Sequence, residues 1–457
     1  MCDSVQMLAV LLVMLSSAIV RGFLLDAYTC QVPDPCTCMP DRLLCGATGL
    51  TAFPDFNATQ LFADRRLDIF IDSNSINIIP DGALALIGTS NATEINMYIQ
   101  NNNISRIDNN AFAGVENELK LLDLTNNNLK TVPMALKSLE NLQTLLLKGN
   151  PLTSLSSSAI FSVSRTLNTL SLSLDQFQQW PSELHYFRRL STLSVDGFQQ
   201  SRLPLNALSG VEATLTTLEI SHSRLDRLPA VICHLDNLRH LDFVSNPDSR
   251  TPLFEPCNHN ITSVHFLNLR DNNLEQFPDV LSSFTALGFL DLSDNHIRVV
   301  DSDAIPPDAS LTHLNLSGNS LHRVPTAINK LSNLRSLYLD NNKIFSLEDF
   351  DLQSLNHLRT INLSMNPLEY LSKGAFYNQA ALDSLYLQFT KLNTIPEAVV
   401  SLASINNLDM TGTPVECTCA MSYLNAWHGN ASTMMGTCEG TGESLGEFVH
   451  QFLPLCP

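Results

Sequence analysis

The sequence predicts an α/β-type repeat solenoid, and three observations support this prediction. A pattern of leucine and asparagine recurs every 23 to 28 residues along most of the chain. A second pattern, of proline, accompanies it at a fixed offset. Cysteines gather at the two ends of the chain. One copy of so short a unit cannot bury its own apolar face, so the copies must stack on one another.

The repeat is clearest in residues 311–321, LTHLNLSGNSL, and residues 334–344, LRSLYLDNNKI. Both fit L-x-x-L-x-L-x-x-N-x-L, and this pattern resembles the leucine-rich repeat. About fifteen copies can be placed, and the positions of their Asn column are Asn74, Asn102, Asn127, Asn150, Asp175, Phe198, Ser223, Asn246, Asn272, Asn295, Asn319, Asn342, Asn366, Thr390 and Thr413. The expected fold is a leucine-rich repeat horseshoe with a parallel sheet along its concave side.

The pattern has a physical explanation. The L-x-L core predicts a short strand whose leucines point inward and whose intervening residue points outward. The chain turns away from the sheet at the Asn, where a buried amide can pair the backbone groups that the turn leaves open. Thr, Ser and Asp are partial substitutes, but Phe198 cannot serve. We therefore expect the stretch from Asp175 to Ser223 to be the least regular.

Proline follows the column position by six residues in nine of the fifteen repeats. Because proline fixes φ and lacks an N–H donor, it suits an irregular convex segment rather than a helix interior. These prolines are Pro80, Pro133, Pro181, Pro204, Pro229, Pro252, Pro278, Pro325 and Pro396.

The N-terminus predicts secretion. Residues 7–20 form an apolar run of 14, which is shorter than the roughly 20 residues of a membrane span and fits a signal peptide. Val20 and Gly22 place the cut before Phe23, although Asp3 departs from the usual basic start. The alternative is an uncleaved anchor. We expect a signal peptide at 1–22, an N-terminal cap at 23–54, the repeat array at 55–415 and a C-terminal cap at 416–457, with no membrane span in the mature, extracellular chain.

Ten cysteines follow the predicted signal peptide, and eight of them gather at the two ends. A solenoid needs a cap at each end, and disulfides hold caps that are too small to bury enough surface. C-x-C neighbours rarely pair with each other, so interleaved and nested pairings remain open in each group. Zinc binding is less favoured in an oxidising compartment. The groups are Cys30, Cys36, Cys38 and Cys45, and Cys417, Cys419, Cys438 and Cys456.

Two further cysteines lie in the middle of the array. Cys233 and Cys257 are 24 residues apart, which is one repeat. Equivalent positions of neighbouring repeats lie close enough for a disulfide. We expect a bridge, and the alternative is two buried free thiols.

The two ends carry a more specific resemblance. PCTC at 35–38, followed by LLCGATGLTAFP at 43–54, resembles the N-terminal cap of animal extracellular leucine-rich repeat proteins. TPVECTCAMSYLNAW at 413–427 resembles the C-terminal cap of Slit proteins, the Nogo receptor and Toll-like receptor ectodomains, with Trp427 at the buried aromatic position and Thr413 where the family usually has Asn. The resemblance implies the pairs Cys30–Cys38, Cys36–Cys45, Cys417–Cys438 and Cys419–Cys456.

Seven N-x-S/T sequons predict glycosylation of a secreted chain. Two of them, Asn315 and Asn362, lie between the strand leucines and are expected on the concave face, where a glycan would cover part of it. The alternative is that the sheet leaves these two unmodified. The seven are Asn57, Asn91, Asn103, Asn260, Asn315, Asn362 and Asn430.

The outward strand positions are the candidate binding residues. They hold more acidic than basic side chains, together with aromatic residues of the kind that dominate binding energy at interfaces. The alternative for the acidic residues is that they only solvate an exposed sheet. The predicted ligand-binding patch is Phe266, Phe289, Asp291, Tyr338, Asp340, Tyr386 and Phe389.

Charge and the absence of catalytic motifs narrow the function. The formal net charge of −19 argues against nucleic acid, heparin-like polymers and anionic lipid as partners. We find no H-E-x-x-H, Walker A or G-x-S-x-G motif, so no enzyme activity and no cofactor are expected. The predicted function is recognition of an extracellular protein or a cell-surface or microbial molecule through the concave face. The alternative is an extracellular matrix component, and the sequence sets no oligomeric state.

Overall fold

The computed structural model describes residues 32–56, 65–249, 253–254, 257–427, 429 and 433–456. The predicted signal peptide, Cys30, Asn57 and Asn430 lie outside these residues. The chain divides into two units, which meet in sequence at Val195 and Asp196. Each unit is a stack of repeated strand–turn segments, and each is described by itself.

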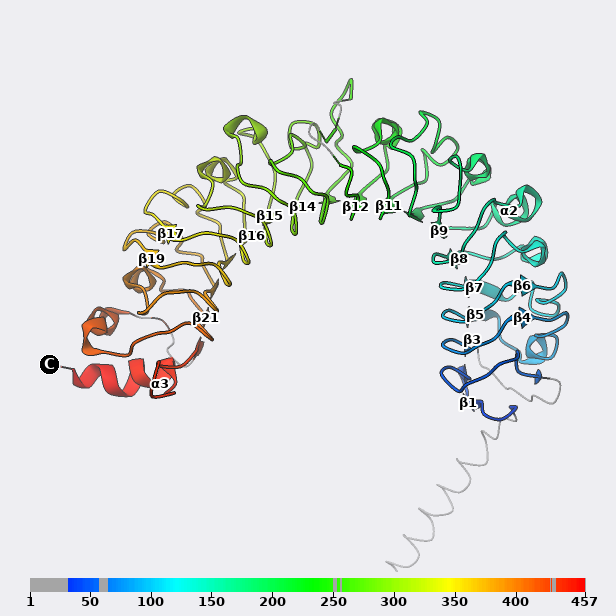
Figure 1. Ribbon diagram of the computed structural model, residues 1–457, viewed down its shortest axis with the longest axis horizontal. Helices are drawn as coiled ribbons and strands as arrows, with labels where there is room; N and C mark the ends of the chain where they lie inside the picture. The colour runs from blue at the N-terminus through cyan, green and yellow to red at the C-terminus, as the bar shows by residue number, and fades with distance from the viewer. Residues whose placement is uncertain are drawn as a thin grey trace, which may run out of the picture. The chain divides into compact units, whose positions relative to one another are not determined.

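The first unit carries a ladder of short strands, one for each repeat, and all pairings after the first hairpin are parallel. Figure 1 shows these strands on one side of the unit and α2, β4 and β6 on the other. Its elements are β1 Thr37–Met39, β2 Arg42–Leu44, β3 Arg66–Phe70, β4 Ile78–Ile79, η3 Ile87–Thr89, β5 Glu94–Tyr98, β6 Arg106–Ile107, β7 Leu119–Asp123, η4 Met134–Ser138, β8 Thr144–Leu147, α2 Ser157–Val163, β9 Thr169–Ser173 and η5 Ser182–Tyr186, with β10 Thr192–Asp196 at the division.

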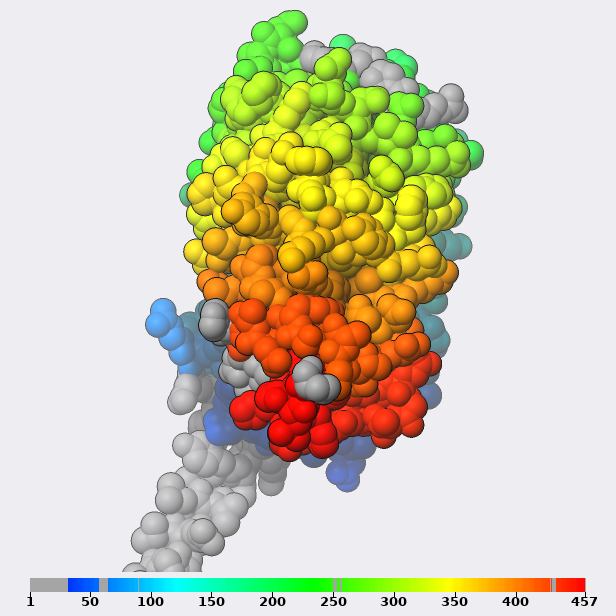
Figure 2. Space-filling view, turned by 90° about the vertical axis from the view of Figure 1, so that its left-hand side faces the viewer, coloured from blue at the N-terminus to red at the C-terminus, as the bar shows by residue number. Residues whose placement is uncertain are grey.

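The second unit repeats the arrangement with a parallel ladder from β11 to β22. Figure 2 shows its repeats packed directly on one another. Its elements are β11 Thr217–Ser221, η6 Ala230–His234, β12 His240–Val244, β13 Phe266–Asn268, β14 Phe289–Asp291, η7 Ser302–Ala304, β15 His313–Asn315, η8 Thr326–Lys330, β16 Ser336–Tyr338, β17 Ser346–Leu347, β18 Thr360–Asn362, β19 Tyr370–Leu371, β20 Ser384–Tyr386, η9 Glu397–Ser401, β21 Asn407–Asp409, η10 Cys419–Ala426, β22 Met434–Met435, α3 Leu445–Glu447, η12 Phe448–Phe452 and η13 Leu453–Leu455.

The core of each unit is made by the strand leucines. Leu290 and Leu292 flank the outward-pointing Asp291, and both leucines are fully buried. Alternation along the strand explains this, because successive side chains point to opposite faces. The outward residues of all repeats thus form one exposed surface in each unit, which we call the sheet face.

The proline pattern marks where the chain leaves the sheet. Five of the nine prolines immediately precede a short 3₁₀ helix, with φ between −63° and −69°. The fixed φ of proline suits this entry, and its missing N–H costs nothing where no hydrogen bond is made. These five are Pro133, Pro181, Pro229, Pro325 and Pro396.

The Asn column binds the turns of neighbouring repeats together. Asn319 is buried, and its Nδ2 donates to the carbonyl oxygens of Leu292 at 2.9 Å and Leu316 at 3.0 Å. Its Oδ1 accepts from the N–H of Ile297 at 2.9 Å. One amide thus pairs its own turn with the repeat before it, as backbone groups inside a solenoid require.

The residue before the column position adopts a left-handed conformation, with φ between 48° and 75°, in every repeat except the one at Asp175. Glycine and short polar residues suit this conformation. Most of the positions follow that preference, but Met365 and Phe389 do not. The fourteen are Ser73, Asn101, Asn126, Gly149, Gly197, His222, Ser245, Asp271, Asp294, Gly318, Asn341, Met365, Phe389 and Gly412.

The irregular stretch lies where the column is interrupted. Asp175 is exposed and does not act as a substitute for Asn, while the preceding Leu174 is buried. Phe198 is buried as an apolar residue, and its N–H donates to Ser223 Oγ at 3.1 Å. Thr413 does replace Asn, since its Oγ1 donates to the carbonyl oxygen of Leu387 at 2.7 Å.

Four disulfides lie among the described residues. They join Cys36 to Cys45, Cys233 to Cys257, Cys417 to Cys438 and Cys419 to Cys456. Cys38 is also disulfide-bonded, whereas Cys30 lies outside the described residues. In the C-terminal cap, Trp427 is buried and its Nε1 donates to the carbonyl oxygen of Leu402 at 3.2 Å. The cap thereby covers the last repeats of the array.

We expect Asn127→Ala to lower the free energy of unfolding by about 3 kcal/mol, because loss of a buried partner leaves backbone groups unpaired at about 1–3 kcal/mol each. Asn127 bonds the carbonyls of Ile99 and Leu124 and the N–H of Ile104. The matched control is its exposed neighbour, Asn128→Ala. Equal urea midpoints for the two variants would contradict the role of the column.

Candidate protein-binding surface

The sheet face of the second unit presents its outward residues in register. Parallel pairing places the central residue of each strand beside its counterpart in the next. This central column contains acidic residues, amides and two tyrosines. Its members are Asp242, Asn268, Asp291, Asn315, Tyr338, Asn362, Tyr386 and Asp409.

An aromatic ladder runs beside the central column, two residues earlier along each strand. It consists of His240, Phe266, Phe289 and His313, on four consecutive strands. The ring centroids of His240 and Phe266 are 4.0 Å apart, those of Phe266 and Phe289 are 4.3 Å apart, and those of Phe289 and His313 are 5.9 Å apart. All three pairs are stacked. Because the faces of the stacked rings cover one another, mainly the ring edges are exposed to solvent.

Hydrogen bonds fix both ends of this aromatic ladder. His240 Nε2 lies 2.7 Å from Asp242 Oδ2, and His313 Nδ1 lies 2.9 Å from Thr312 Oγ1. The rings therefore have few rotamers left to lose when a partner binds.

The central column is held by hydrogen bonds between neighbouring strands. Asn315 Nδ2 donates to Asp291 Oδ2 at 3.1 Å, and Asn362 Nδ2 donates to Asp340 Oδ1 at 2.9 Å. Asp340 also accepts from Ser317 Oγ at 2.6 Å. The polar side chains of this face are thus ordered before any partner arrives.

The sheet face of the second unit is acidic. Among the described residues, Asp291, Asp340 and Asp409 form no ion pair. Arg270, which lies on the same face, is engaged with Asp294 at 2.8 Å. Carboxylates that no cation neutralises leave a negative potential, which attracts basic surfaces.

The predicted patch falls into four groups on this face. Phe266 and Phe289 lie in the aromatic ladder. Tyr338 and Tyr386 lie in the central column with Asn362 between them, while Asp291 and Asp340 belong to the hydrogen-bonded network. Phe389 lies in the turn after β20. The sequence predicted that these residues share one face, but it did not predict how they divide into groups.

Sequence analysis also missed three residues of this face. His240 and His313 each precede a central strand leucine, as Phe266 and Phe289 do. Comparing that position across the repeats would have found the ladder. Met365 occupies the same turn position as Phe389, directly before the column residue.

Met365 and Phe389 combine an unfavourable backbone with solvent exposure. Their φ angles are 54° and 53°, a conformation that costs a bulky residue about 1–3 kcal/mol. Their side chains are 56% and 57% exposed, so core packing does not account for them. The Phe389 ring lies over Gly412, where an added Cβ would come within 2.5 Å of ring carbons.

The sheet face of the first unit carries a smaller aromatic pair. Phe70 and Tyr98 stack with centroids 4.8 Å apart. Burial raises the pKa of the Tyr98 hydroxyl, and the nearby Asp68 carboxylate raises it further. Arg66 Nε donates to Asp68 Oδ1 at 2.9 Å, and this hydrogen bond raises the pKa of the guanidinium. In the first unit the carboxylate beside the aromatic pair, that of Asp68, is neutralised by Arg66. Among the described residues of the second unit, Asp291 and Asp340 have no such cation.

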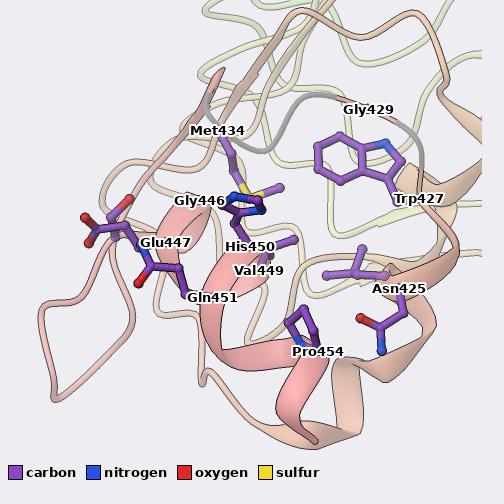
Figure 3. A pocket seen from close by; sticks show the side chains of 12 residues that line it. Asn425, Trp427, Gly429, Met434, Gly446, Glu447, Val449, His450, Gln451 and Pro454 are labelled. Carbon is purple, nitrogen blue, oxygen red and sulfur yellow. The ribbon is translucent and has the colours of Figure 1, made fainter.

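A cavity of about 620 Å³ lies in the C-terminal cap. Figure 3 shows Trp427 and His450 among its lining side chains. Met434 and Val449 are buried and contribute apolar surface to it, whereas Glu447 and Gln451 are exposed. Gly429 of the cavity lining is flanked in sequence by residues outside those that the structure describes.

Two features are absent from the part of the chain that the structure describes. No helix there is both long and apolar enough to cross a bilayer. No group of three or more His, Cys, Asp or Glu side chains there could hold a metal ion.

Comparison with known proteins agrees with the repeat architecture. The family model described as "Leucine rich repeat" matches residues 96–152, 290–344, 309–368 and 356–415. The high affinity nerve growth factor receptor of Rattus norvegicus is 31% identical over 109 residues, which are 24% of this chain and 13% of that protein. Chondroadherin of Homo sapiens is 30% identical over 94 residues, 20% of this chain and 26% of that protein. The matches thus span about an eighth and a quarter of these relatives.

Solved structures show the same fold. A leucine-rich repeat protein of Leptospira interrogans has a TM-score of 0.59 and 22% identity, covering 81% of this chain and 90% of that one. The structure of the Toll–Spatzle complex from Drosophila has a TM-score of 0.62 and 17% identity, covering 88% of this chain and 62% of that one.

We expect Phe389→Asn to raise the free energy of unfolding by about 1 kcal/mol, because Asn tolerates the left-handed conformation that strains Phe. Asn occupies the same position in Asn341 and Asn126. Phe350→Asn is the control, since Phe350 is exposed but has no positive φ. A Phe389→Asn variant that unfolds at lower urea than the Phe350→Asn variant would disprove the strain.

Proposed function

The chain belongs to the leucine-rich repeat proteins, and on this premise we propose that it is a secreted protein that recognises an extracellular protein or a microbial surface molecule. Recognition takes place on the sheet face of the second unit. The mechanism is binding by an ordered surface, with no chemical step. Two relatives support this class of function by name, the high affinity nerve growth factor receptor and the Toll–Spatzle complex.

The observation that carries the proposal is the aromatic ladder. The leucine core is complete without these rings, because Leu267 and Leu290 are fully buried behind them. Phe266 and Phe289 are half-buried and remain accessible on the sheet face. Aromatic side chains that are already ordered lose little entropy on binding, and they are frequent hot spots.

Disulfides support the secreted location. Bridges such as Cys36–Cys45 and Cys419–Cys456 persist in oxidising compartments and are rare in the cytosol. A solenoid held at its ends in this way suits the extracellular space.

We expect glycans at Asn103 and Asn260, whose side chains are exposed, and none at Asn315 or Asn362. The last two amides already donate to Asp291 and Asp340 and accept from the N–H groups of Ser317 and Ser364 at 3.0 Å. A glycan would displace part of this network. Glycopeptide mass spectrometry of the secreted protein measures the occupancy, and full occupancy at Asn315 would argue against a free sheet face.

We expect replacement of sheet-face aromatics to weaken binding to partners found in a screen of purified extracellular proteins, collagens and microbial glycans. Phe266→Ala/Phe289→Ala and Tyr338→Ala/Tyr386→Ala should each weaken binding about 30-fold or more, as removal of a hot spot of about 2 kcal/mol does. Surface plasmon resonance measures the affinities.

The matched control for this screen is Phe350→Ala/Tyr377→Ala. These two side chains are strongly exposed and belong to the same unit, but they lie outside the strands of the main sheet. Their replacement should leave affinity within about twofold. If binding of a partner depended on Phe350 and Tyr377 but not on the sheet face, the binding site would lie outside the sheet face and the proposal would be wrong.

A further inference from the structure

The C-terminal part of this sheet face holds a second exposed group, separate from the aromatic ladder. It consists of Met365, Phe389 and Met435, and we call it the C-terminal apolar group. All three side chains are more than two-fifths exposed. Exposed apolar side chains that gather around polar residues mark protein interaction sites.

Strand register places Met365 and Phe389 in adjacent turns, and it places Met435 two strands beyond β20 on the same face. Asn362 of β18 pairs with Tyr386 of β20, so Met365 and Phe389, each three residues later, occupy equivalent turns of adjacent repeats. The N–H of Met365 donates to the carbonyl oxygen of Gln388 at 2.8 Å. Further along the ladder, Asp409 lies between Tyr386 and Met435 in the central column. The group therefore lines the end of the central column.

The backbone strain at Met365 and Phe389 indicates a purpose outside the core. Twelve other repeats fill this position with glycine, asparagine, aspartate, serine or histidine. Two successive repeats instead hold bulky apolar residues that stay exposed. Strained conformations persist mainly where function requires the side chain. Gly412 leaves the space in which the Phe389 ring lies, so the ring has a defined position.

Charge decides which partner this surface fits. Asp340 directly precedes Asn341, whose N–H donates to the carbonyl oxygen of Ser364 beside Met365 at 2.9 Å, and Asp340 has no ion pair among the described residues. Asp409 has none there either, but it is buried and accepts from Gln388 Nε2 at 2.7 Å and from Thr411 Oγ1 at 2.6 Å. Lys391 lies near Phe389 in sequence but is paired with Glu369 at 3.1 Å. An apolar group beside an uncompensated carboxylate complements an apolar side chain flanked by Lys or Arg.

We infer that the C-terminal apolar group binds a basic segment of a protein partner, whose apolar side chains pack on Met365, Phe389 and Met435 while a neighbouring Lys or Arg approaches Asp340. This inference rests on the proposed function, because it assigns a partner class to the same sheet face. It goes further by placing a second contact away from the aromatic ladder. A second copy of this acidic chain fits less well, since like charges repel.

The test uses a displayed library of random twelve-residue peptides selected on the full secreted chain. Selection uses the unmodified chain alone, and Met365→Asn/Phe389→Asn is then compared with it, because Asn fits the left-handed backbone and should not harm folding. The selected peptides should carry Lys or Arg around Leu, Phe or Trp. Their affinity, measured by fluorescence anisotropy, should fall about tenfold or more in the double variant, and higher salt should weaken it.

Phe350→Ala/Tyr377→Ala is the control and should bind these peptides unchanged, whereas Phe266→Ala/Phe289→Ala measures any contribution of the aromatic ladder. Acidic or neutral consensus peptides, peptides that bind the double variant equally, or no selective peptides would each overturn the inference. Peptides that depend on the ladder alone would also overturn it while preserving the proposed function. Light scattering that shows a dimer dissociated by Met365→Asn/Phe389→Asn would replace the basic partner with a second copy.

Discussion

The fold depends on pairing the backbone groups that are left open where each strand ends. A chain that turns every two dozen residues must bury these groups inside the solenoid, and each unpaired one would cost about 1–3 kcal/mol. The side-chain amide of Asn319 bonds three of these groups, two carbonyls and one N–H. They belong to its own turn and to the repeat before it. Each such contact ties one repeat to the repeat before it.

The same turn restricts the residue before the asparagine to a left-handed conformation. Glycine and short polar side chains accept that restriction at little cost. Met365 and Phe389 do not, and they remain exposed. Neither backbone preference nor core packing therefore explains these two residues in the turn.

Register turns a sequence of similar strands into a surface. Because the strands pair in parallel, equivalent residues become neighbours across the sheet, although they are 23 to 26 residues apart in the chain. This is why four rings stack in one ladder and why asparagines reach the carboxylates of the preceding strand. The surface that we propose for recognition is therefore a product of the repeat itself.

The sequence by itself determined the repeat, its strand leucines and the asparagine column, because each of these recurs at a fixed spacing and has a local physical cause. It also indicated which residues point outward, since alternation along a strand is local. It could not show that His240 and His313 extend the phenylalanine pair, that Asp175 leaves the column, or that Phe389 lies over Gly412. Those facts depend on which atoms of different repeats come within reach of each other, and only tertiary packing decides that.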